Sequence, residues 1–501
     1  MKYLKLALAV IFSLITVFSA ACENKTEVCG KSVLINETSL VFDGNEIQSV
    51  ERLKHNIRQF TKLKSVNMGT FAVEPSEGER LKEEFPGVEF KHEILVELFG
   101  NKYPSNAVFL DFSKLEINDI TELELALPSF HSLNKISMGE NLVEAERLEK
   151  LENEYPNVEF DAIALYDVYG RKIREDGSLL NLNKVEIDEH LTEKLSLLKN
   201  LKRVELYEQP SLTLDQRVEL VKMFPELSFG WDYTFMGDEY DSNSDELILK
   251  NVKLKSTEEV EKFLTIFPNI KFVDMSYCGI SNDDMAELRS KFEGQCEIVW
   301  TLKFGIWEMR TDATSFSVLV AWLDECRIIK NKDLELLKYT TNLQALDLGH
   351  QSITDITAIC EYCPELRILI LADNKVKDIT PISKLKHLHY VEFFWGNKFS
   401  DLSPLAECKE LVDINISYVY PLRDFSALYD FPKLERLWIE HLSISNAEVE
   451  ALRKKYPNAK IVNIGKGSVD NGWRTHHRYY SMIYAFRHPL EPLKDDFMMY
   501  G

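Results

Sequence analysis

The sequence has little cysteine, proline or glycine for its length, and after its first 22 residues it has no long apolar run. Its 501 residues include 8 cysteines, 16 prolines and 20 glycines. So low a cysteine content in so long a chain argues against a disulfide-rich scaffold. No Pro/Gly/Ser-rich linker divides the chain into separate globules, and no later stretch is apolar enough to predict a membrane-spanning helix.

Positive charge is also scarce. The chain has 59 Lys and Arg against 81 Asp and Glu, which gives a formal net charge of -22. This balance argues against a nucleic-acid partner, because phosphates require a basic face. It is compatible with solubility or with a cationic partner.

The cysteines form no metal-binding pattern. Cys360 and Cys363 make a single CxxC without a second pair nearby, so a zinc site is not expected. Cys363 and Cys408 each lie three residues before a leading leucine of a repeat, which indicates packing residues. A disulfide between Cys278 and Cys296 stays open. We expect no metal and no other cofactor.

Catalytic signatures are incomplete at residues that their chemistry requires. A HExxH-like start at His92 has Val96 where the second zinc-binding histidine belongs. The glycine motif at Gly465 lacks its last glycine. A calcium-loop-like start at Asp241 has Glu246 in place of the turn glycine, so weak Ca²⁺ binding is only the alternative to a surface loop there. The sequence therefore predicts a protein that is not an enzyme.

The first 22 residues have the layout of a secretion signal. Lys2 and Lys5 precede an apolar core over residues 6–18, and the stretch ends in Ser19-Ala-Ala-Cys22. A core of this length is too short to span a bilayer. We predict a signal peptide over 1–21 and a lipid-anchored Cys22, although Ser19 stands where a lipobox usually has leucine. Ordinary cleavage and secretion are the alternative, and both place the mature chain outside the cytoplasm.

One spacing of aliphatic residues recurs through 343–464. A large aliphatic residue is followed three positions on by a second, and two positions later by a third. The leading residues recur every 22 to 25 positions, which marks an array whose coils are each too small to bury their own apolar face. The triplets are Leu343, Leu346 and Leu348; Leu366, Leu369 and Leu371; Leu388, Val391 and Phe393; Leu411, Ile414 and Ile416; Leu434, Leu437 and Ile439; and Ala459, Val462 and Ile464.

A second series keeps the same period. Asp355, Asp378, Asp401 and Asp424 each begin a triplet that continues with an apolar residue and Ser or Thr. With the stretch Ile353-Thr-Asp-Ile-Thr, these repeats resemble the short leucine-rich repeats of internalin-like surface proteins of Firmicutes. The resemblance implies a right-handed α/β array with a parallel sheet on its concave face and helices or short turns on its convex face. It implies a binding protein and leaves the ligand open.

The N-terminal two thirds repeat at roughly three times this length. The same triplet returns at intervals of 70, 68 and 69 residues, each time followed by a stretch with helical spacing, an aromatic residue and a closing glycine. The leading residues are Leu63, Leu133, Leu201 and Ile270, the aromatic residues are Phe85, Tyr155, Phe224 and Phe292, and the glycines are Gly100, Gly170, Gly237 and Gly305.

We expect three strand cores in each long unit, among them Leu115-x-Ile117, Ile136-x-Met138 and Val185-x-Ile187. The stretch 88–99 is too long for one repeat strand, so the third element is predicted as a hairpin or a bent strand. The predicted order is a tether over 22–36, long units over 37–305, a transition coil over 306–342, short repeats over 343–464 and a cap or tail over 465–501.

Acidic residues dominate the predicted concave face. A residue between two core aliphatics points away from the core, because side chains alternate along a strand. Stacked like charges repel, so this acid ladder is either a solvated face that resists sideways aggregation or a site for a cationic ligand, a basic protein or bridging Ca²⁺. The ladder comprises Glu89, Glu116, Glu159, Glu186, Glu205, Asp274, Glu297, Asp347 and Glu392, with Lys253 as the one clear base.

Aromatic residues replace the acids on this face toward the C-terminus. Exposed rings suit stacking on a sugar or anchoring a peptide, and they are unfavourable unless something covers them. The aromatic and basic stretch 472–487 is the other candidate cover, and an end cap is expected over Val462 and Ile464. The predicted ligand-binding patch comprises His350, Arg367, Tyr390, Glu392, Phe394, Trp395, Tyr418, Trp438 and His441.

The sequence thus predicts an exported surface protein that binds a protein or glycan through its concave face, without a nucleic-acid partner and with membrane contact only through an acylated Cys22. A purely structural envelope protein is the first alternative. A glycan-processing enzyme is the second, and it would need paired carboxylates across a cleft rather than carboxylates in a row.

Overall fold

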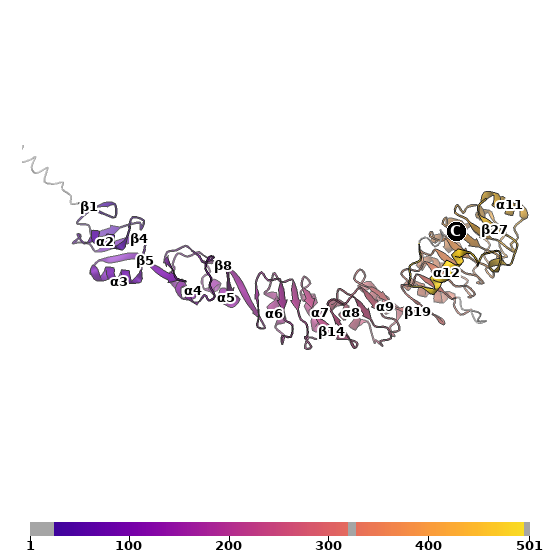
Figure 1. Cartoon of the computed structure of the whole chain (residues 1–501), viewed down its shortest axis with the longest axis horizontal. Helices are drawn as coiled ribbons and strands as arrows, with labels where there is room; N and C mark the ends of the chain where they lie inside the picture. The colour runs from indigo at the N-terminus through magenta and orange to yellow at the C-terminus, as the bar shows by residue number, and fades with distance from the viewer. Residues whose placement is uncertain (1–24, 319–326, 495–501) are drawn as a thin grey trace, which may run out of the picture. The chain divides into compact units, whose positions relative to one another are not determined.

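The computed structural model describes residues 25–318 and 327–494, so the predicted signal peptide and Cys22 lie outside the described residues. The chain forms two compact units. The first comprises Met1–Ser211 and Phe224–Gly230, and the second comprises Leu212–Met223 and Trp231–Gly501. Within each unit, short parallel strands alternate with helices or turns (Figure 1).

The first unit contains three parallel sheets and antiparallel hairpins that join their ends. Its strands are β1 (Lys25–Val28), β2 (Lys31–Leu34), β3 (Ser39–Val41), β4 (Ser65–Val73), β5 (Glu89–Leu98), β6 (Asn101–Pro104), β7 (Phe109–Asp111), β8 (Lys135–Glu144), β9 (Glu159–Val168), β10 (Arg171–Arg174), β11 (Leu179–Asn181), β12 (Arg203–Glu205) and β13 (Ser228–Gly230). Its helices are α2 (Val50–Ile57), α3 (Pro75–Glu84), α4 (Thr121–Ala126), η1 (Leu127–Ser129), α5 (Ala145–Glu154) and α6 (Leu191–Ser196).

The second unit ends in a seven-stranded parallel sheet in the order β21 to β27, which we call the C-terminal sheet. The strands of the unit are β14 (Asp232–Phe235), β15 (Asp238–Asp241), β16 (Glu246–Ile248), β17 (Phe272–Asp274), β18 (Glu297–Val299), β19 (Thr301–Phe304), β20 (Trp307–Arg310), β21 (Ser315–Ser317), β22 (Ala345–Asp347), β23 (Ile368–Ile370), β24 (Tyr390–Glu392), β25 (Asp413–Asn415), β26 (Arg436–Trp438) and β27 (Lys460–Val462).

Helices and short turns connect these strands. Between β23 and β26 the connections shorten to the 3₁₀ helices η3 to η5, which is how a repeat of only 22 or 23 residues closes. The helices are α7 (Leu214–Met223), α8 (Glu258–Ile266), α9 (Asn282–Lys291), η2 (Asn331–Tyr339), α10 (Thr357–Tyr362), η3 (Thr380–Lys384), η4 (Ser403–Glu407), η5 (Ser426–Tyr429), α11 (Asn446–Lys455), η6 (Gly467–Val469) and α12 (His477–Arg487).

The middle residue of each three-residue stretch that pairs in parallel faces the core, and its two neighbours face the other side, which we call the concave face. Val66, Ile136, Leu346 and Leu369 occupy this middle position and are fully buried. Stacking coils gives each of these side chains an apolar partner above and below. The predicted parallel leucine-rich array is confirmed.

In the first two long units the third element is a bent strand that continues into a hairpin, and in the other two a short parallel strand is followed by a separate hairpin. In β5, the residues up to Lys91 pair in parallel with β4, and Leu95 to Leu98 pair antiparallel with β6. The turn residues Phe99 and Gly100 have φ of 49° and 72°, a pair of left-handed conformations typical of a two-residue hairpin turn. This explains the glycine at the end of each long repeat.

Two predicted strand cores are wrong. Leu115 and Ile117, like Val185 and Ile187, follow a strand rather than form one. The strands β7 and β11 centre instead on Leu110 and Leu180, which are buried. The later aliphatics lie in the turn, where Ile117 packs on the same core. An aliphatic pair therefore predicts that its residues lie at the core, but these residues are not always in a strand.

The cysteines of the described residues are free thiols. Cys278 and Cys296 form no disulfide, and the Cys278 thiol donates to the carbonyl of Leu249 at 3.1 Å. Burial raises the pKa of Cys278 to about 11. Cys363 and Cys408 are buried between coils, as predicted for packing residues.

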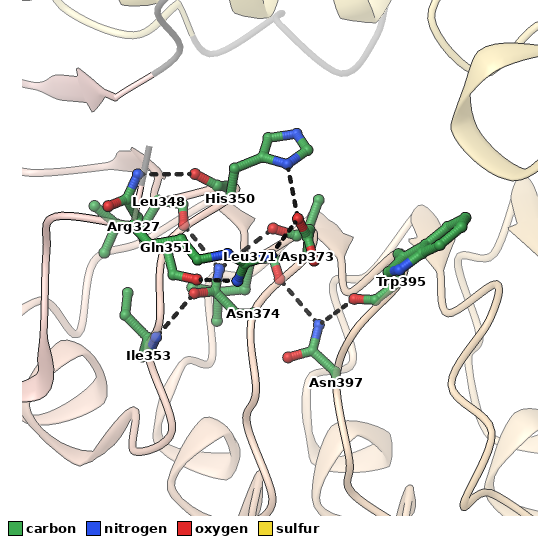
Figure 2. A network of polar contacts seen from close by, with 12 residues as sticks. Arg327, Leu348, His350, Gln351, Ile353, Leu371, Asp373, Asn374, Trp395 and Asn397 are labelled. Carbon is green, nitrogen blue, oxygen red and sulfur yellow. Dashed lines mark hydrogen bonds and ion pairs between the residues drawn. The ribbon is translucent and has the colours of Figure 1, made fainter. Parts of the chain in front are cut away.

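A ladder of buried amides fixes the turns after β22, β23 and β24 (Figure 2). The Asn374 amide accepts from the N–H of Ile353 at 3.0 Å and donates to the carbonyl of Leu348 at 2.8 Å. Asn397 repeats these contacts one coil later, with Val376 and Leu371. Gln351 accepts from the N–H of Ile329. Each amide thus joins consecutive coils through backbone groups that would otherwise be buried without partners.

Replacing Asn397 with Ala is therefore expected to destabilise the second unit by about 2–4 kcal/mol, because several buried backbone groups lose their partner. All seven tryptophans lie after residue 230, so unfolding in urea followed by tryptophan fluorescence reports on this unit. The exposed Lys377→Ala is the matched control and should change stability by less than about 0.5 kcal/mol. Equal stability of the two variants would contradict the amide ladder.

Candidate functional site

One backbone position after each of the strands β22 to β26 has the left-handed conformation. It lies two residues after the third aliphatic residue of the triplet, with φ between 51° and 63°. Its N–H continues the hydrogen bonding between coils, for example from His350 to Ala372 at 2.7 Å and from Trp395 to Ser417 at 3.0 Å. We call these residues the rim row: His350, Asp373, Trp395, Tyr418 and His441.

The left-handed conformation belongs to the fold and not to the side chain. Lys184, Glu208 and Asn251 have it at the same position in earlier coils. It costs a non-glycine residue roughly 1–2 kcal/mol, and the inter-coil hydrogen bonds hold it in place. The backbone conformation therefore does not require aromatic side chains at this position, and their succession is specific to this part of the sequence.

Three rings of the rim row stack on one another. The Trp395 and Tyr418 rings have centroids 5.1 Å apart at 27°, and Tyr418 and His441 follow at 4.1 Å and 22°. Phe394 packs edge-on against Tyr418 at 5.5 Å. We call Phe394, Trp395, Tyr418 and His441 the rim patch. Each contact has a geometry that aromatic rings favour, so the rings hold each other in fixed positions.

A polar cluster lies at the N-terminal end of the rim patch. Asp373 pairs with Arg327 at 3.0 Å and with His350 Nδ1 at 3.1 Å. In Figure 2 His350 and Trp395 point away from the buried amides of Asn374 and Asn397. The Trp395 side chain is 53% exposed. The arrangement offers flat apolar surface beside a carboxylate, an imidazole and a guanidinium, which suits a sugar or a peptide side chain.

The other predicted patch residues are covered. Tyr390, Glu392 and Trp438 are buried, because residues 465–494 lie over the concave face of the C-terminal sheet. Trp473 from this segment packs on Tyr390 and Trp438, and its indole N–H donates to Glu392 at 2.9 Å. The prediction that these three side chains are exposed to a ligand is wrong. The alternative prediction, that the C-terminal segment covers them, agrees with the structure.

Arg367 lies at the far end of the same segment. It is half-buried, and its guanidinium approaches the carbonyl of Lys494 at 3.4 Å. It belongs to the covered face and is separate from the rim patch. The predicted end cap is wrong in one respect, because Ile464 stays 81% exposed. The segment covers the face of the sheet, and α11 packs against β27 at the end of the array.

The acid ladder does not form one row. Glu116 and Glu186 lie in turns after β7 and β11, because the strands there are shorter and earlier than predicted. Glu205 pairs with Arg203 at 2.5 Å. The residues that do lie exposed in strands are Glu89, Glu159 and Glu297.

Basic residues that the sequence analysis did not place also lie on this face. Lys135 pairs with Glu159 at 2.6 Å, and Lys91 lies two residues after Glu89 in β5. Lys253, in contrast, follows β16 by several residues and donates to the carbonyl of Tyr277. The concave face of the first unit is therefore mixed in charge.

Two ladder members support the fold. Asp274 and Asp347 are buried, and each accepts a hydrogen bond from the N–H two residues later, from Ser276 at 2.8 Å and Gly349 at 3.0 Å. Such a contact starts the turn after the strand. Within the described residues, no group of three or more His, Cys, Asp or Glu side chains is arranged to hold a metal ion.

These coils define a leucine-rich-repeat fold, and residues 364–407 match the family model described as "Leucine Rich repeats (2 copies)". No curated protein matches the sequence. The described residues contain no helix with the length and hydropathy of a membrane span.

Solved structures with similar repeats come from bacteria and plants. An internalin of Listeria monocytogenes is 14% identical, with 87% of this chain and 86% of that chain covered and a TM-score of 0.23. A leucine-rich-repeat protein of Leptospira interrogans is 14% identical, with 84% and 88% covered and a TM-score of 0.21. The ectodomain of a receptor kinase of Arabidopsis thaliana is 10% identical, with 82% and 54% covered and a TM-score of 0.25.

Asp347 is expected to make stability depend on pH. Burial raises the pKa of this carboxyl to about 6, although the Gly349 amide and the Ser317 hydroxyl favour its charged form. Since the folded-state pKa lies above the usual value near 4, its stabilising contribution is complete below about pH 4 and is lost as pH rises through 6.

Asp347→Asn should therefore match the parent chain at pH 4 and exceed its stability by on the order of 2–3 kcal/mol at pH 7.5. Thermal unfolding across this range, followed by tryptophan fluorescence, measures the difference. The exposed Glu361→Gln is the control. A difference that does not change with pH would contradict the raised pKa.

Proposed function

We propose that the chain is an exported cell-surface leucine-rich-repeat protein that binds a protein or glycan ligand through the rim patch. The observation behind the proposal is the stack of Trp395, Tyr418 and His441, in which Trp395 and His441 are exposed and Tyr418 is half-buried, although the neighbouring aromatics are covered by the chain itself. Surface aromatics gathered in one place are typical of interaction sites.

Preorganisation favours this surface for binding. Inter-coil hydrogen bonds hold the backbone of Trp395 and Tyr418, and the rings restrict one another by stacking. A ligand therefore meets side chains whose rotamers are already fixed, so less conformational entropy is lost on association. His350 and Asp373 at the end of the row supply hydrogen-bonding groups.

The location of this function depends on the N-terminal signal. Export, and a lipid tether at Cys22 that would bring the chain to a membrane surface, are part of the proposal and rest on the sequence pattern alone. The boundaries of the predicted repeats and the absence of enzymatic activity likewise stay predictions. A purely structural envelope role would leave the rim patch without a ligand.

Trp395→Ala and Tyr418→Ala are each expected to weaken ligand binding at least tenfold, because each removes an aromatic anchor. The purified chain is first screened against glycan arrays and surface proteins, and the affinity of the variants is then measured by surface plasmon resonance. Tyr480→Ala removes an exposed ring outside the rim patch and should leave the affinity unchanged.

The salt dependence of the binding affinity distinguishes binding through the rim patch from binding through a charged surface. Binding through the rings should persist in 1 M NaCl, whereas binding through exposed carboxylates would be lost as charges are screened. A ligand that binds the Trp395 and Tyr418 variants as tightly as the parent chain would refute the rim patch as the site. Complete absence of ligands from the screens would favour the structural role.

A further inference from the structure

The concave face of the C-terminal sheet is a groove that the chain fills with its own segment. Residues 465–494 leave the last strand and run back over the sheet to the first one. The carbonyl of Ala485 accepts from the Ser315 hydroxyl at 2.7 Å, and that of Pro489 accepts from the Thr314 N–H at 2.7 Å. In Figure 1 the yellow helix α12 lies against the coils of this sheet.

Trp473 is the central apolar anchor of this segment. Its side chain is fully buried between the rings of Tyr390 and Trp438, at centroid distances of 5.2 Å and 5.1 Å. The Arg436 guanidinium lies 4.7 Å from the indole centroid. The indole N–H of Trp473 donates to Glu392, so both the apolar ring and the polar edge of the indole have a partner.

Arg478 is the charged anchor, five residues after Trp473. Its guanidinium is buried and donates to Asp413 at 2.9 Å and also to Glu435. Asp413 accepts from Arg436 as well, so one fully buried carboxylate serves two guanidinium groups. The groove therefore presents an indole slot and a carboxylate at a fixed spacing.

Side-chain contacts, more than main-chain pairing, attach the segment to the array. Among the described residues, only one backbone-to-backbone hydrogen bond joins it to the strands, from Thr314 to Pro489. The connecting stretch 465–472 contains three glycines with positive φ. Its Val469 is 64% exposed. This stretch is itself held at Glu440, which accepts hydrogen bonds from the Gly467 N–H and from the Asn471 amide, so release is expected to begin C-terminal to it.

The fit of the segment is also incomplete. Several buried polar atoms at this interface have no hydrogen-bond partner in the described part of the chain, among them Trp438 Nε1, Asn415 Nδ2, Ser468 Oγ and His477 Nε2. Each such atom costs about 1–3 kcal/mol. Two of these atoms, Trp438 Nε1 and Asn415 Nδ2, belong to the sheet, so the groove has two donors that a different segment with the same two anchors could engage.

We propose that this groove is a peptide-binding site that recognises a tryptophan followed five residues later by an arginine, and that residues 472–494 occupy it until a partner polypeptide with the same two anchors displaces them. The charges are complementary, because Glu392, Asp413 and Glu435 face the segment and its Arg478. The two anchors of the groove are not residues of the rim patch, but the connecting stretch touches that patch, because the Gly465 carbonyl lies 2.9 Å from His441 Nε2 and Gly467 packs on the Phe394 ring. The peptide competition below therefore tests the groove by its own anchors, Trp473 and Arg478.

In the first experiment, the covering segment is cut from the rest of the chain so that an added peptide can replace it. A recognition site for a sequence-specific protease is inserted after Val469 in the full chain, and the purified protein is cleaved, so that the segment is held only by its contacts. A fluorescent peptide of residues 470–494 is then added, and its anisotropy is followed. We expect the peptide to enter the groove as the cleaved segment leaves.

Unlabelled peptides test the two anchors by competition. Peptides with Trp473→Ala or Arg478→Ala should compete at least tenfold more weakly than the parent peptide. A Tyr480→Ala peptide is the matched control and should compete equally, because this ring is exposed. A cleaved chain that takes up no peptide, or equal competition by all peptides, would overturn the proposal.

Hydrogen exchange of the intact chain tests release without cleavage. Amides of residues 473–487 should exchange at least tenfold faster than those of β23 to β26, because the segment opens while the coils stay folded. Exchange of both sets at the same rate would mean that the segment opens only when the unit unfolds. That result would make it a permanent part of the core and refute displacement.

Discussion

The spacing between neighbouring coils is the constraint on which the other features of the second unit depend. Parallel hydrogen bonds fix it along the strands, and the amides of Asn374 and Asn397 fix it in the turns. Because the coils repeat at this spacing, side chains at equivalent positions form rows. Aromatic residues at one such position must therefore stack, as Trp395 and Tyr418 do.

The repeat period allowed most of the core to be predicted. Leu346, Leu369 and Val391 lie where the triplet pattern placed them, since each strand has one residue between two outward ones. The pattern failed at Leu115 and Ile117 because turn residues that pack on the core obey the same aliphatic preference as strand residues. A three-residue strand is too short for its own alternation to settle the register.

The site could be predicted only in part, for a related reason. Alternation along a strand predicts the face on which Trp438 and Tyr390 lie. It does not predict which other segment covers that face. Their cover comes from Trp473, which is distant in sequence and has no repeat pattern of its own. Its one signal was an aromatic and basic composition, opposite in charge to the rest of the chain. The amide role of Asn397 was hidden because Gly396 shifts it by one position relative to Asn374.

The contacts between residues 465–494 and the C-terminal sheet favour recognition of a specific peptide over general stabilisation of the sheet. An apolar segment over an apolar face would stabilise the sheet without specifying its own register. Here the apolar cluster around Trp473 is joined by Asp413 with two guanidinium groups. Buried ion pairs lose about as much free energy through desolvation as they gain by attraction. Their effect is to penalise every register in which a charge is left alone. A groove of this kind therefore discriminates between segments by the spacing of an indole and a guanidinium, which general hydrophobic cover would not do.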